Sequence, residues 1–416
     1  MITLSAEVPD ILSDEHDKDP QIAYRYLREE APAVFHPGSN SYLLSRHADI
    51  LRLIRGKDVT SANYGDGLGL IFGRTVLEMD GREHQKHRLL LNPLMNGDDL
   101  AALRPLMVSV ITEMFLPELE AASAPVRRGE SDVAEIDLVT TYFGELPISV
   151  IEKMLDLPRE EHENFSRWYK AMHAFTANIA GEPGPIERGL KAREEMTELV
   201  LPMIKERREK PGTDLISRMC HAEIEGERLT DEEVRAFVSL MITAGGETTD
   251  RALGLTLLNL IEHPDQLAAV IEDRSLIRNA FVETLRYSPP VNIAGRQAAV
   301  DIELHGTTIP AGSSINCLIG AANRDPRKFA DADTFDIFRS DNNVDRGFTG
   351  AADHLGFANG RHFCVGAHLA KAEIEIALNL IFDNMHDIRL AEGFVPEPTG
   401  LWTRGVDNLR IAYTPV

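Results

Sequence analysis

The amino-acid sequence predicts a mainly α-helical protein with a minor antiparallel β part. Apolar residues recur at helical spacing over most of residues 100–227, and prolines are expected to separate the helices of that stretch. A second helical pattern, about 32 residues long, begins at a capping box over Thr230–Glu233 and ends at His263. Short alternating segments bounded by glycine and proline, as in residues 301–312, indicate hairpins.

The composition is that of an ordinary globular protein. The chain has 416 residues, 43% hydrophobic and 26% charged, and we expect one domain spanning residues 1–416. The net charge of −23 disfavours nucleic acid and anionic membranes as partners. No segment approaches the ~18 apolar residues of a membrane span, and residues 1–10 lack signal-peptide features. We therefore expect a cytoplasmic protein.

The N-terminal part is expected to combine short helices with a hairpin. A helix near Gln21–Glu29 precedes two strands over residues 33–35 and 41–44, and a helix over His47–Arg55 follows them. Residues 61–81 mix glycines with apolar side chains. That mixture indicates a mobile loop facing a ligand rather than plain solvent.

Two of the helices expected after this segment have a recognisable pattern on one face, the first polar and the second apolar. His84 and Arg88 are one helical turn apart and share a face, which in most proteins is a solvated one. Farther along, aromatic and apolar residues recur at helical spacing, a pattern more typical of core than of a ligand site. They are Phe165, Trp168, Tyr169, Met172, Phe175 and Ile179.

The long helix after Thr230 has an unusual middle, Ala244-Gly-Gly-Glu-Thr-Thr249. Two glycines inside a helix cost about 1 kcal/mol each relative to alanine, so something must compensate. One interpretation is a close helix crossing that needs the glycines. The other, which we favour, is a local opening of the helix in which a side-chain hydroxyl binds a backbone carbonyl and leaves a groove for a small molecule.

The C-terminal half begins with a charged pair and continues as β-structure. Glu283 and Arg286 are three residues apart on one helical face, which by itself is typical of a weak surface pair. After Pro290 the pattern changes to extended segments and hairpins. The expected extended segments are residues 291–296, 301–312, 314–319, 401–405 and 409–413.

Cys364 follows a glycine-containing and aromatic loop and precedes an apolar pattern at helical spacing. The cysteine is therefore expected near a helix N-terminus, where the positive end of the helix dipole favours a thiolate, the form that binds metals. A buried structural cysteine is the alternative. The other two cysteines, Cys220 and Cys317, are expected to pack in the core, and three scattered cysteines argue against a disulfide framework.

The loop Phe357-Ala-Asn-Gly-Arg-His362-Phe-Cys364-Val-Gly366 resembles the haem-binding loop of the cytochrome P-450 superfamily, Phe-Gly-x-Gly-x-His/Arg-x-Cys-x-Gly. Ala358 stands where glycine is usual, which puts the local turn in question more than the ligand. Three further segments resemble family motifs and occur in the family's order. They are His84…Arg88, Ala244–Thr249 and Glu283…Arg286.

The resemblance implies a cytochrome P-450 fold, with a long central helix over haem b and Cys364 as the metal ligand on the proximal side. It implies oxygen-handling roles for Glu247 and Thr248, and a buried structural pair of Glu283 and Arg286 with Arg339 as a third partner. Cofactor contacts are expected from His84, Arg88, Ala244, Gly245, Arg296, Phe357, His362 and Gly366. Substrate contacts are expected from Leu77, Phe175, Ile179, Leu240, Val291, Ile293, Leu401 and Trp402.

The function implied by this resemblance is haem-thiolate monooxygenation of a small-to-medium apolar organic substrate, by hydroxylation or oxidative dealkylation with O2. No reductase module is expected in the chain, so electrons from NAD(P)H would come through a separate ferredoxin or flavodoxin-type donor and its reductase. The docking cations would be Arg82, Lys86, Arg361 and Lys371. The alternatives are a peroxide-driven peroxygenase of the same fold and a non-catalytic haem-thiolate gas sensor.

Overall fold

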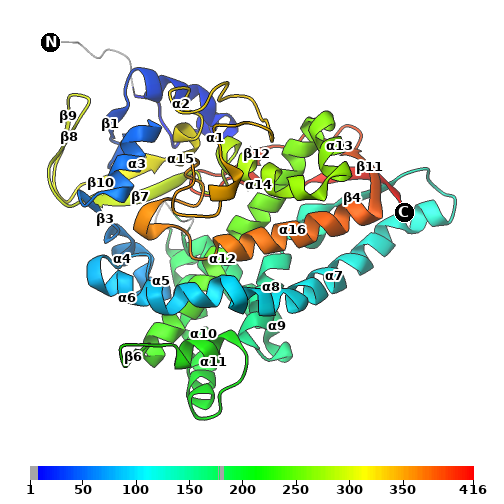
Figure 1. Cartoon of the computed structure of the whole chain (residues 1–416), viewed down its shortest axis with the longest axis horizontal. Coiled ribbons are helices and arrows are strands. Elements are labelled where there is room, and N and C mark those ends of the chain that lie inside the picture. Colours follow the sequence, from blue (N-terminus) through cyan, green and yellow to red (C-terminus); the bar gives the residue numbers. More distant parts are fainter. Residues whose placement is uncertain (1–7, 177, 179–181) are drawn as a thin grey trace. The chain divides into compact units, whose positions relative to one another are not determined.

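The computed structural model describes residues 8–176, 178 and 182–416 (Figure 1). The chain divides into two compact units, each built from separate stretches of sequence. The first takes the residues through Asn63 together with Glu262–Cys364 and Pro396–Asp407, and the second takes Tyr64–Ile261, Val365–Val395 and Asn408–Val416. Our expectation of a single domain remains a prediction.

The first unit contains a five-stranded sheet in the order β1-β2-β10-β7-β3. All neighbouring strands are antiparallel except β10 and β2, which run parallel; a parallel pair needs a long crossover, and these two strands are far apart in sequence. Its helices are α1 (Asp14–Lys18), α2 (Pro20–Glu29), α3 (His47–Arg55), α13 (Pro264–Glu272), α14 (Ile277–Tyr287) and α15 (Ile319–Ala322). Its strands are β1 (Ala33–His36), β2 (Ser41–Leu44), β3 (Val59–Thr60), β7 (Ile293–Ala298), β8 (Ile302–Leu304), β9 (Thr307–Ile309), β10 (Ser314–Leu318), β12 (Pro398–Thr399) and β13 (Gly405–Val406).

The second unit is mainly helical and has a small antiparallel sheet in the order β11-β14-β4. Its helices are α4 (Asn63–Gly67), α5 (Gly69–Phe72), α6 (Gly81–Leu91), α7 (Gly97–Arg127), α8 (Leu146–Leu155), α9 (His162–Thr176), α10 (Pro183–Glu209), α11 (Leu215–His221), α12 (Asp231–Glu262) and α16 (Ala367–Asn384). Its strands are β4 (Ala134–Asp137), β5 (Glu223–Ile224), β6 (Glu227–Arg228), β11 (Met385–Leu390) and β14 (Arg410–Pro415). The prediction of a mainly helical fold with minor β-structure is confirmed.

Helix α12 has 32 residues and is unbroken over its whole length, as its sequence pattern predicts. Nearly every residue from Val234 to Ile261 is buried, and the uncovered ones are concentrated around Ala244–Asp250. A helix of this length rises about 48 Å. The exposure around Ala244–Asp250 is therefore a local feature of an otherwise buried helix.

Residues 61–81, the glycine-rich segment that was expected to be a mobile loop, contain the short helices α4 and α5. Ile71 and Phe72 are buried, and Arg235 of α12 donates a hydrogen bond from Nη2 to the Phe72 carbonyl oxygen at 3.0 Å. This bond satisfies a carbonyl at the end of α5 that the helix itself leaves without a partner. Burial and one charged hydrogen bond therefore order a segment whose glycines favour a loop.

Helix α7 corrects two expectations. Pro105, Pro117 and Pro125 lie inside it, whereas prolines in this stretch were expected to separate helices. By length and composition α7 is also long and apolar enough to cross a membrane, whereas no such segment was expected. In this fold α7 packs against α8, α16 and β4, and some of its apolar residues, such as Met107 and Ile111, are buried, whereas Val108 and Leu116 are exposed.

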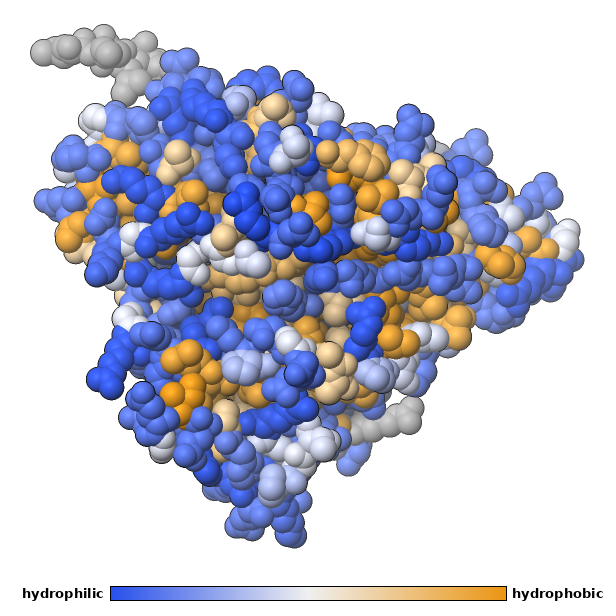
Figure 2. Space-filling view, in the orientation of Figure 1, coloured by the Kyte–Doolittle hydropathy of each residue, from blue (hydrophilic) through white to orange (hydrophobic). Residues whose placement is uncertain are grey.

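The face seen in Figure 2 is mostly polar, and its apolar residues are scattered in small groups. The exposed large apolar side chains come from many different elements, which is normal for a protein surface. They include Leu12, Ile22, Phe35, Leu70, Leu89, Val300, Phe338 and Val395.

Candidate functional site

Cys364 lies in an ordered loop, three residues before the first residue of α16, whose N-cap is Gly366. Its backbone N–H donates a hydrogen bond to the Phe357 carbonyl oxygen at 2.9 Å, and the Phe357 ring packs edge-on against Phe281 and Phe363. The Cys364 side chain is exposed. Aromatic packing thus holds the loop, and its cysteine lies at the protein surface.

The two other cysteines do not fit a metal ligand. Cys317 is in the core of the first unit, and burial raises the pKa of its thiol to about 11. Cys220 is also fully buried, and burial raises the pKa of its thiol as well. Because a metal binds the thiolate, Cys364 is the cysteine whose surroundings suit the task.

Ala358 adopts a left-handed backbone conformation, with φ of 56°. This conformation costs an L-residue about 1–2 kcal/mol and costs glycine little. The turn nevertheless forms, since the Ala358 N–H donates to the Leu355 carbonyl oxygen at 2.8 Å. The family's usual glycine at this position therefore matches a real backbone requirement, which alanine meets with strain.

Contacts from the α3–β3 region fasten the cysteine loop within the first unit. Arg55 donates from Nε to Asn359 Oδ1 at 2.6 Å, and Arg361 donates from Nη2 to the Gly56 carbonyl oxygen at 2.7 Å. The Ser61 hydroxyl lies 3.3 Å from His362 Nε2. These contacts fix the positions of three polar loop residues, Asn359, Arg361 and His362.

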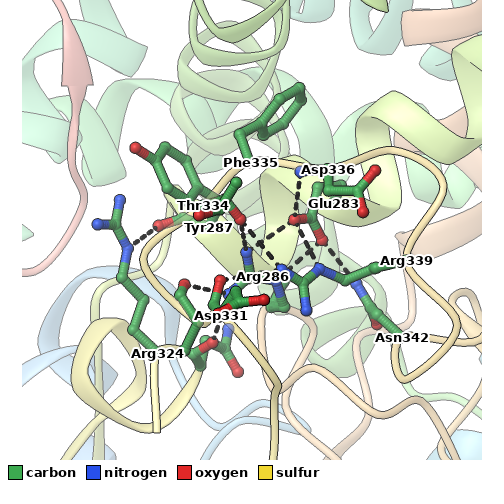
Figure 3. A network of polar contacts seen from close by, with 12 residues as sticks. Glu283, Arg286, Tyr287, Arg324, Asp331, Thr334, Phe335, Asp336, Arg339 and Asn342 are labelled. Carbon is green, nitrogen blue, oxygen red and sulfur yellow. Dashed lines mark hydrogen bonds and ion pairs between the residues drawn. The ribbon is translucent and has the colours of Figure 1, made fainter. Parts of the chain in front are cut away.

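A buried polar network surrounds Glu283 and Arg286 (Figure 3). Arg286 bonds the Glu283 carboxylate through Nε and Nη2 at 2.9 and 2.7 Å. Its Nη1 and Nη2 also donate to the carbonyl oxygens of Ala332 and Thr334 at 2.7 and 2.8 Å. The sequence pattern alone favoured a surface pair, whereas both side chains are almost completely buried.

The middle of α12 carries the acid and alcohol singled out from the sequence. The Thr248 hydroxyl donates to the Ala244 carbonyl oxygen at 2.8 Å. Glu247 Oε2 lies 2.7 Å from His173 Nε2 on α9, and its other oxygen lies 3.7 Å from Arg251 Nε. Ala244 is exposed and Thr248 is partly exposed, so these residues, one turn apart, form an open strip on a buried helix.

The two glycines of α12 are explained by close packing. A Cβ on Gly245 would lie 2.7 Å from Ile151 of α8, and one on Gly246 would lie 2.7 Å from Tyr169 of α9. The expected hydroxyl-to-carbonyl bond is present at Thr248, but the helix does not open. The close-crossing interpretation therefore accounts for the glycines, and the favoured one is corrected in this respect.

Cationic and imidazole side chains suited to carboxylates occur in both units. His84 and Arg88 lie one turn apart on α6, and His84 is buried. Arg296 of β7 is buried, with Nη1 donating to the Gly295 carbonyl oxygen at 2.6 Å. Guanidinium and imidazole groups suit the carboxylates of haem propionates, so these three residues stay candidates for that contact.

The predicted substrate contacts differ in their exposure. Ile293 and Leu240 are buried, and Ile293 belongs to a core cluster with Tyr24, against which Leu401 and Trp402 pack. Leu77, Phe175 and Val291 are partly buried, whereas Ile179 lies outside the described residues. A surface hollow of 680 Å³ on α9 contains none of the predicted site residues. The pocket assignments remain predictions.

Three of the four proposed docking cations already have partners within the protein. Lys86 forms an ion pair with Glu227, and Lys371 Nζ lies 3.5 Å from Glu375 Oε1. Arg361 bonds backbone carbonyls of the first unit. Such pairs reduce the positive potential that would attract an acidic electron donor, so this docking surface also remains a prediction.

His173 is the main residue of this site that the sequence did not single out. It lies beside Met172 in the amphipathic stripe of α9, but nothing in the sequence pairs it with Glu247. The contact depends on how α9 crosses α12, which local patterns do not report. Asn359 and Ser61 were not singled out either, because their partners, Arg55 and His362, are far from them in the sequence.

A family profile described as Cytochrome P450 matches residues 57–386. The chain is 36% identical over 405 residues to pulcherriminic acid synthase of Bacillus subtilis (strain 168), covering 97% of each protein. It is 31% identical over 395 residues to the cyclomarin C epoxidase CymV of Salinispora arenicola (strain CNS-205), covering 94% of each. Its structure is similar to that of CYP109E1 from Bacillus megaterium in complex with testosterone, with a TM-score of 0.81 and 25% identity over 96% of this chain and 100% of that one.

Proposed function

The chain belongs to the cytochrome P450 family and is a haem-dependent monooxygenase, and we propose that it inserts one oxygen atom of O2 into a small-to-medium apolar organic molecule. The reaction would be a hydroxylation or an oxidative dealkylation. The observation that carries the proposal is the exposed Cys364 thiol at the end of the Phe357–Gly366 loop, just before α16.

Cys364 would ligate the iron. The helix that follows supplies the positive end of its dipole, which lowers the free energy of a thiolate relative to a thiol. When bound, haem with a thiolate ligand supplies the chemistry that splits O2 and oxidises unactivated C–H bonds. The protein's task is to hold the thiolate in place, and the bonds to Asn359, Arg361 and His362 support that task.

His84, Arg88, Arg296 and His362 would bind the propionates. Guanidinium groups bind carboxylates through paired N–H donors, and imidazole adds a single donor. Ala244 and Gly245 would lie against the macrocycle, since neither carries a side chain beyond Cβ. Phe357 and Gly366 would shape the loop on the thiolate side, where Phe357 packs against Phe281.

Glu247 and Thr248 of α12 would deliver protons to the reacting oxygen. The Thr248 hydroxyl can hold a water or a reacting oxygen by hydrogen bonds, at the expense of its present bond to Ala244. The Glu247 carboxylate has a short contact to His173, so it must exchange that contact to carry a proton toward Thr248. Replacement of Glu247 by glutamine is expected to slow turnover.

The substrate is proposed as a class only. The predicted contacts are mostly aliphatic and aromatic, which suits an apolar molecule. The relative at 36% identity is named for forming pulcherriminic acid, so the precursor of pulcherriminic acid is the first compound to test on this protein. A screen for ligand-induced spin-state shifts would extend the search to other compounds.

Electrons would come from NAD(P)H through a separate ferredoxin or flavodoxin-type donor and its reductase, and the protein would work in the cytoplasm. The two alternatives are a peroxide-driven peroxygenase and a gas sensor. The open strip at Ala244 and Thr248, with Glu247 beside it, favours the monooxygenase, because neither alternative needs an acid and an alcohol placed to deliver protons.

The deciding experiment follows the oxygen atom. The purified holoenzyme is supplied with NADPH, a plant-type ferredoxin, its reductase and ¹⁸O-labelled O2, and products of the pulcherriminic acid precursor and of the spin-shift hits are analysed by mass spectrometry. One ¹⁸O atom in a product supports the proposal. Turnover with hydrogen peroxide alone would support the peroxygenase, and reversible gas binding without any product would support the sensor.

A further inference from the structure

Glu247 makes a shorter contact with a histidine than with the permanently charged Arg251. His173 Nε2 lies 2.7 Å from Glu247 Oε2, and the two side chains are 30% and 13% exposed. The imidazole thus contacts solvent on one side and the nearly buried carboxylate on the other. Of the common side chains, histidine changes its charge between pH 5 and 8 and so can both take up and release a proton there.

We propose that His173 is the solvent-side relay that reloads Glu247 with protons during turnover. In this step the Nε2–H bond of the imidazolium breaks and an O–H bond forms on Glu247 Oε2. The products are a neutral imidazole and a neutral carboxylic acid. The acid then turns toward Thr248, and the imidazole takes its next proton from water. This inference rests on the proposed monooxygenase function, and His173 acts through Glu247 rather than on the substrate.

The geometry favours a relay over a fixed clamp. Arg251 lies on the same side of α12 but its Nε is 3.7 Å from Glu247 Oε1, a weaker contact than the 2.7 Å contact of His173. An arginine cannot lose its proton under working conditions, so Arg251 can orient the carboxylate but not recharge it. His173 therefore supplies what Arg251 lacks.

The remaining charged and titratable neighbours leave this role to His173. On α9, burial raises the pKa of Tyr169, whose ring lies 6.1 Å from that of His173, so the phenol keeps its proton. Glu145, the N-cap residue of α8, is already paired with Lys170 of α9 at 3.0 Å. On α10, Glu195 is bonded to Trp168 and Arg167.

Two substitutions separate a relay from a clamp. His173→Gln keeps a hydrogen-bond donor but removes the titrating ring, and His173→Arg keeps a cation beside Glu247 but cannot release its proton. A relay requires both variants to lower turnover. A clamp requires His173→Arg to behave like the unmodified protein.

A matched control lies on the same helix. His162 Nδ1 lies 2.6 Å from Glu152 Oε2, so this pair has the same chemistry without contact to Glu247. His162→Gln should leave every measurement below unchanged apart from overall stability.

The experiment measures NADPH oxidation, product and hydrogen peroxide with a plant-type ferredoxin and its reductase, from pH 5.5 to 8.5, using 7-ethoxycoumarin as the probe. We expect the rate of product formation to fall about tenfold in both His173 variants, because His173 acts through Glu247, and we expect its pH dependence to flatten. Oxidation driven by added hydrogen peroxide, which brings its own protons, should be unchanged. A His173→Arg variant as active as the unmodified protein, or an unaltered pH profile in His173→Gln, would overturn the relay.

A second readout needs no turnover. Urea unfolding of His173→Gln, Glu247→Gln and the double variant should show non-additive shifts of the midpoint at pH 6 that shrink at pH 8.5, because the pair loses its charge attraction. Additive shifts at both values would also overturn the inference. If the monooxygenase proposal itself failed, the unmodified protein would lack ferredoxin-driven NADPH oxidation, whereas failure of the relay would leave that activity intact in every variant.

Discussion

Arg339 Nε lies 2.9 Å from Glu283 Oε1, and Arg286 Nη2 lies 2.7 Å from the same oxygen. One buried carboxylate thus holds two guanidinium groups, and the Asp336 backbone N–H donates to it as well. Arg286 in turn donates to backbone carbonyls that follow α15, including those of Asn323 and Ala332. The network therefore joins α14 to a long irregular segment that has no regular secondary structure to hold it.

Replacement of Glu283 by glutamine should destabilise the protein by about 3–5 kcal/mol, because it leaves two buried guanidinium groups without their counter-charge. Urea unfolding of the holoprotein measures this loss, and the yield of haem-loaded protein should fall with it. The control is Arg25→Gln, which breaks an exposed ion pair with Asp333 and should cost less than about 1 kcal/mol. Equal losses in the two variants would show that the network is not structural.

Replacement of Ala358 by glycine should stabilise the protein by about 1 kcal/mol. The left-handed φ of 56° strains alanine but not glycine, and this gain outweighs the greater freedom of glycine in the unfolded chain. The control is Ala351→Gly, an exposed residue of the same region outside the left-handed conformation, which should be neutral or destabilising. A less stable Ala358→Gly variant would mean that alanine is not strained there.

Replacement of Thr248 by alanine should leave substrate binding and NAD(P)H consumption largely intact but divert electrons to hydrogen peroxide. Product per NAD(P)H is expected to fall about tenfold, since the hydroxyl that positions a proton donor is lost. Thr256 is the matched control, because its hydroxyl makes the same bond to a carbonyl one turn back, that of Ala252, in a fully buried part of α12. Undiminished coupling in Thr248→Ala would contradict the assigned role.

Acid should destabilise the protein in part through His354. Burial lowers the pKa of His354 from its ordinary value of 6.5 to about 4, so the folded state stays neutral where the unfolded state binds a proton. The unfolded state therefore gains protons as the pH falls below 6.5, and stability decreases until the folded pKa is passed. Between pH 7 and 5 the loss from this residue is about 2 kcal/mol.

The measurement for this prediction is urea unfolding of the unmodified protein and of His354→Gln at pH 7 and pH 5. The variant can be less stable at both values, since His354 Nδ1 accepts a hydrogen bond from the Gly356 N–H. The prediction concerns only how much the free energy of unfolding changes between pH 7 and pH 5. That difference should be smaller in the variant by about 2 kcal/mol, and an unchanged difference would exclude the buried histidine as its source.

Local patterns predicted much of this fold correctly. Helix α3 begins and ends at His47 and Arg55 as expected, the hairpin of β1 and β2 lies where its turn residues indicate, and α12 has its predicted length. In each case periodicity, caps and turn residues agree with the final packing. Patterning failed where packing overruled propensity, as for the prolines inside α7 and the glycine-rich segment that contains α5.

The candidate site was predictable in its residue types but not in its contacts. The motif around Cys364 identified the loop, and the structure adds that Ala358 is in a left-handed conformation and that Asn359 and Arg361 bond to Arg55 and Gly56. The partner of Glu247 is on another helix, and no pattern along the chain relates His173 to it. Contacts between distant segments depend on crossing angles, which residue spacing does not encode.

The central claim, that Cys364 binds haem iron as a thiolate, is tested most directly by the absorption spectrum of the dithionite-reduced protein under carbon monoxide. We predict the thiolate-specific Soret band for the unmodified protein and for Cys317→Ser, whose side chain is in the core. The band should be lost in Cys364→Ser and in Cys364→Ala. A band that survives replacement of Cys364, or that is absent from the haem-loaded unmodified protein, would contradict the account.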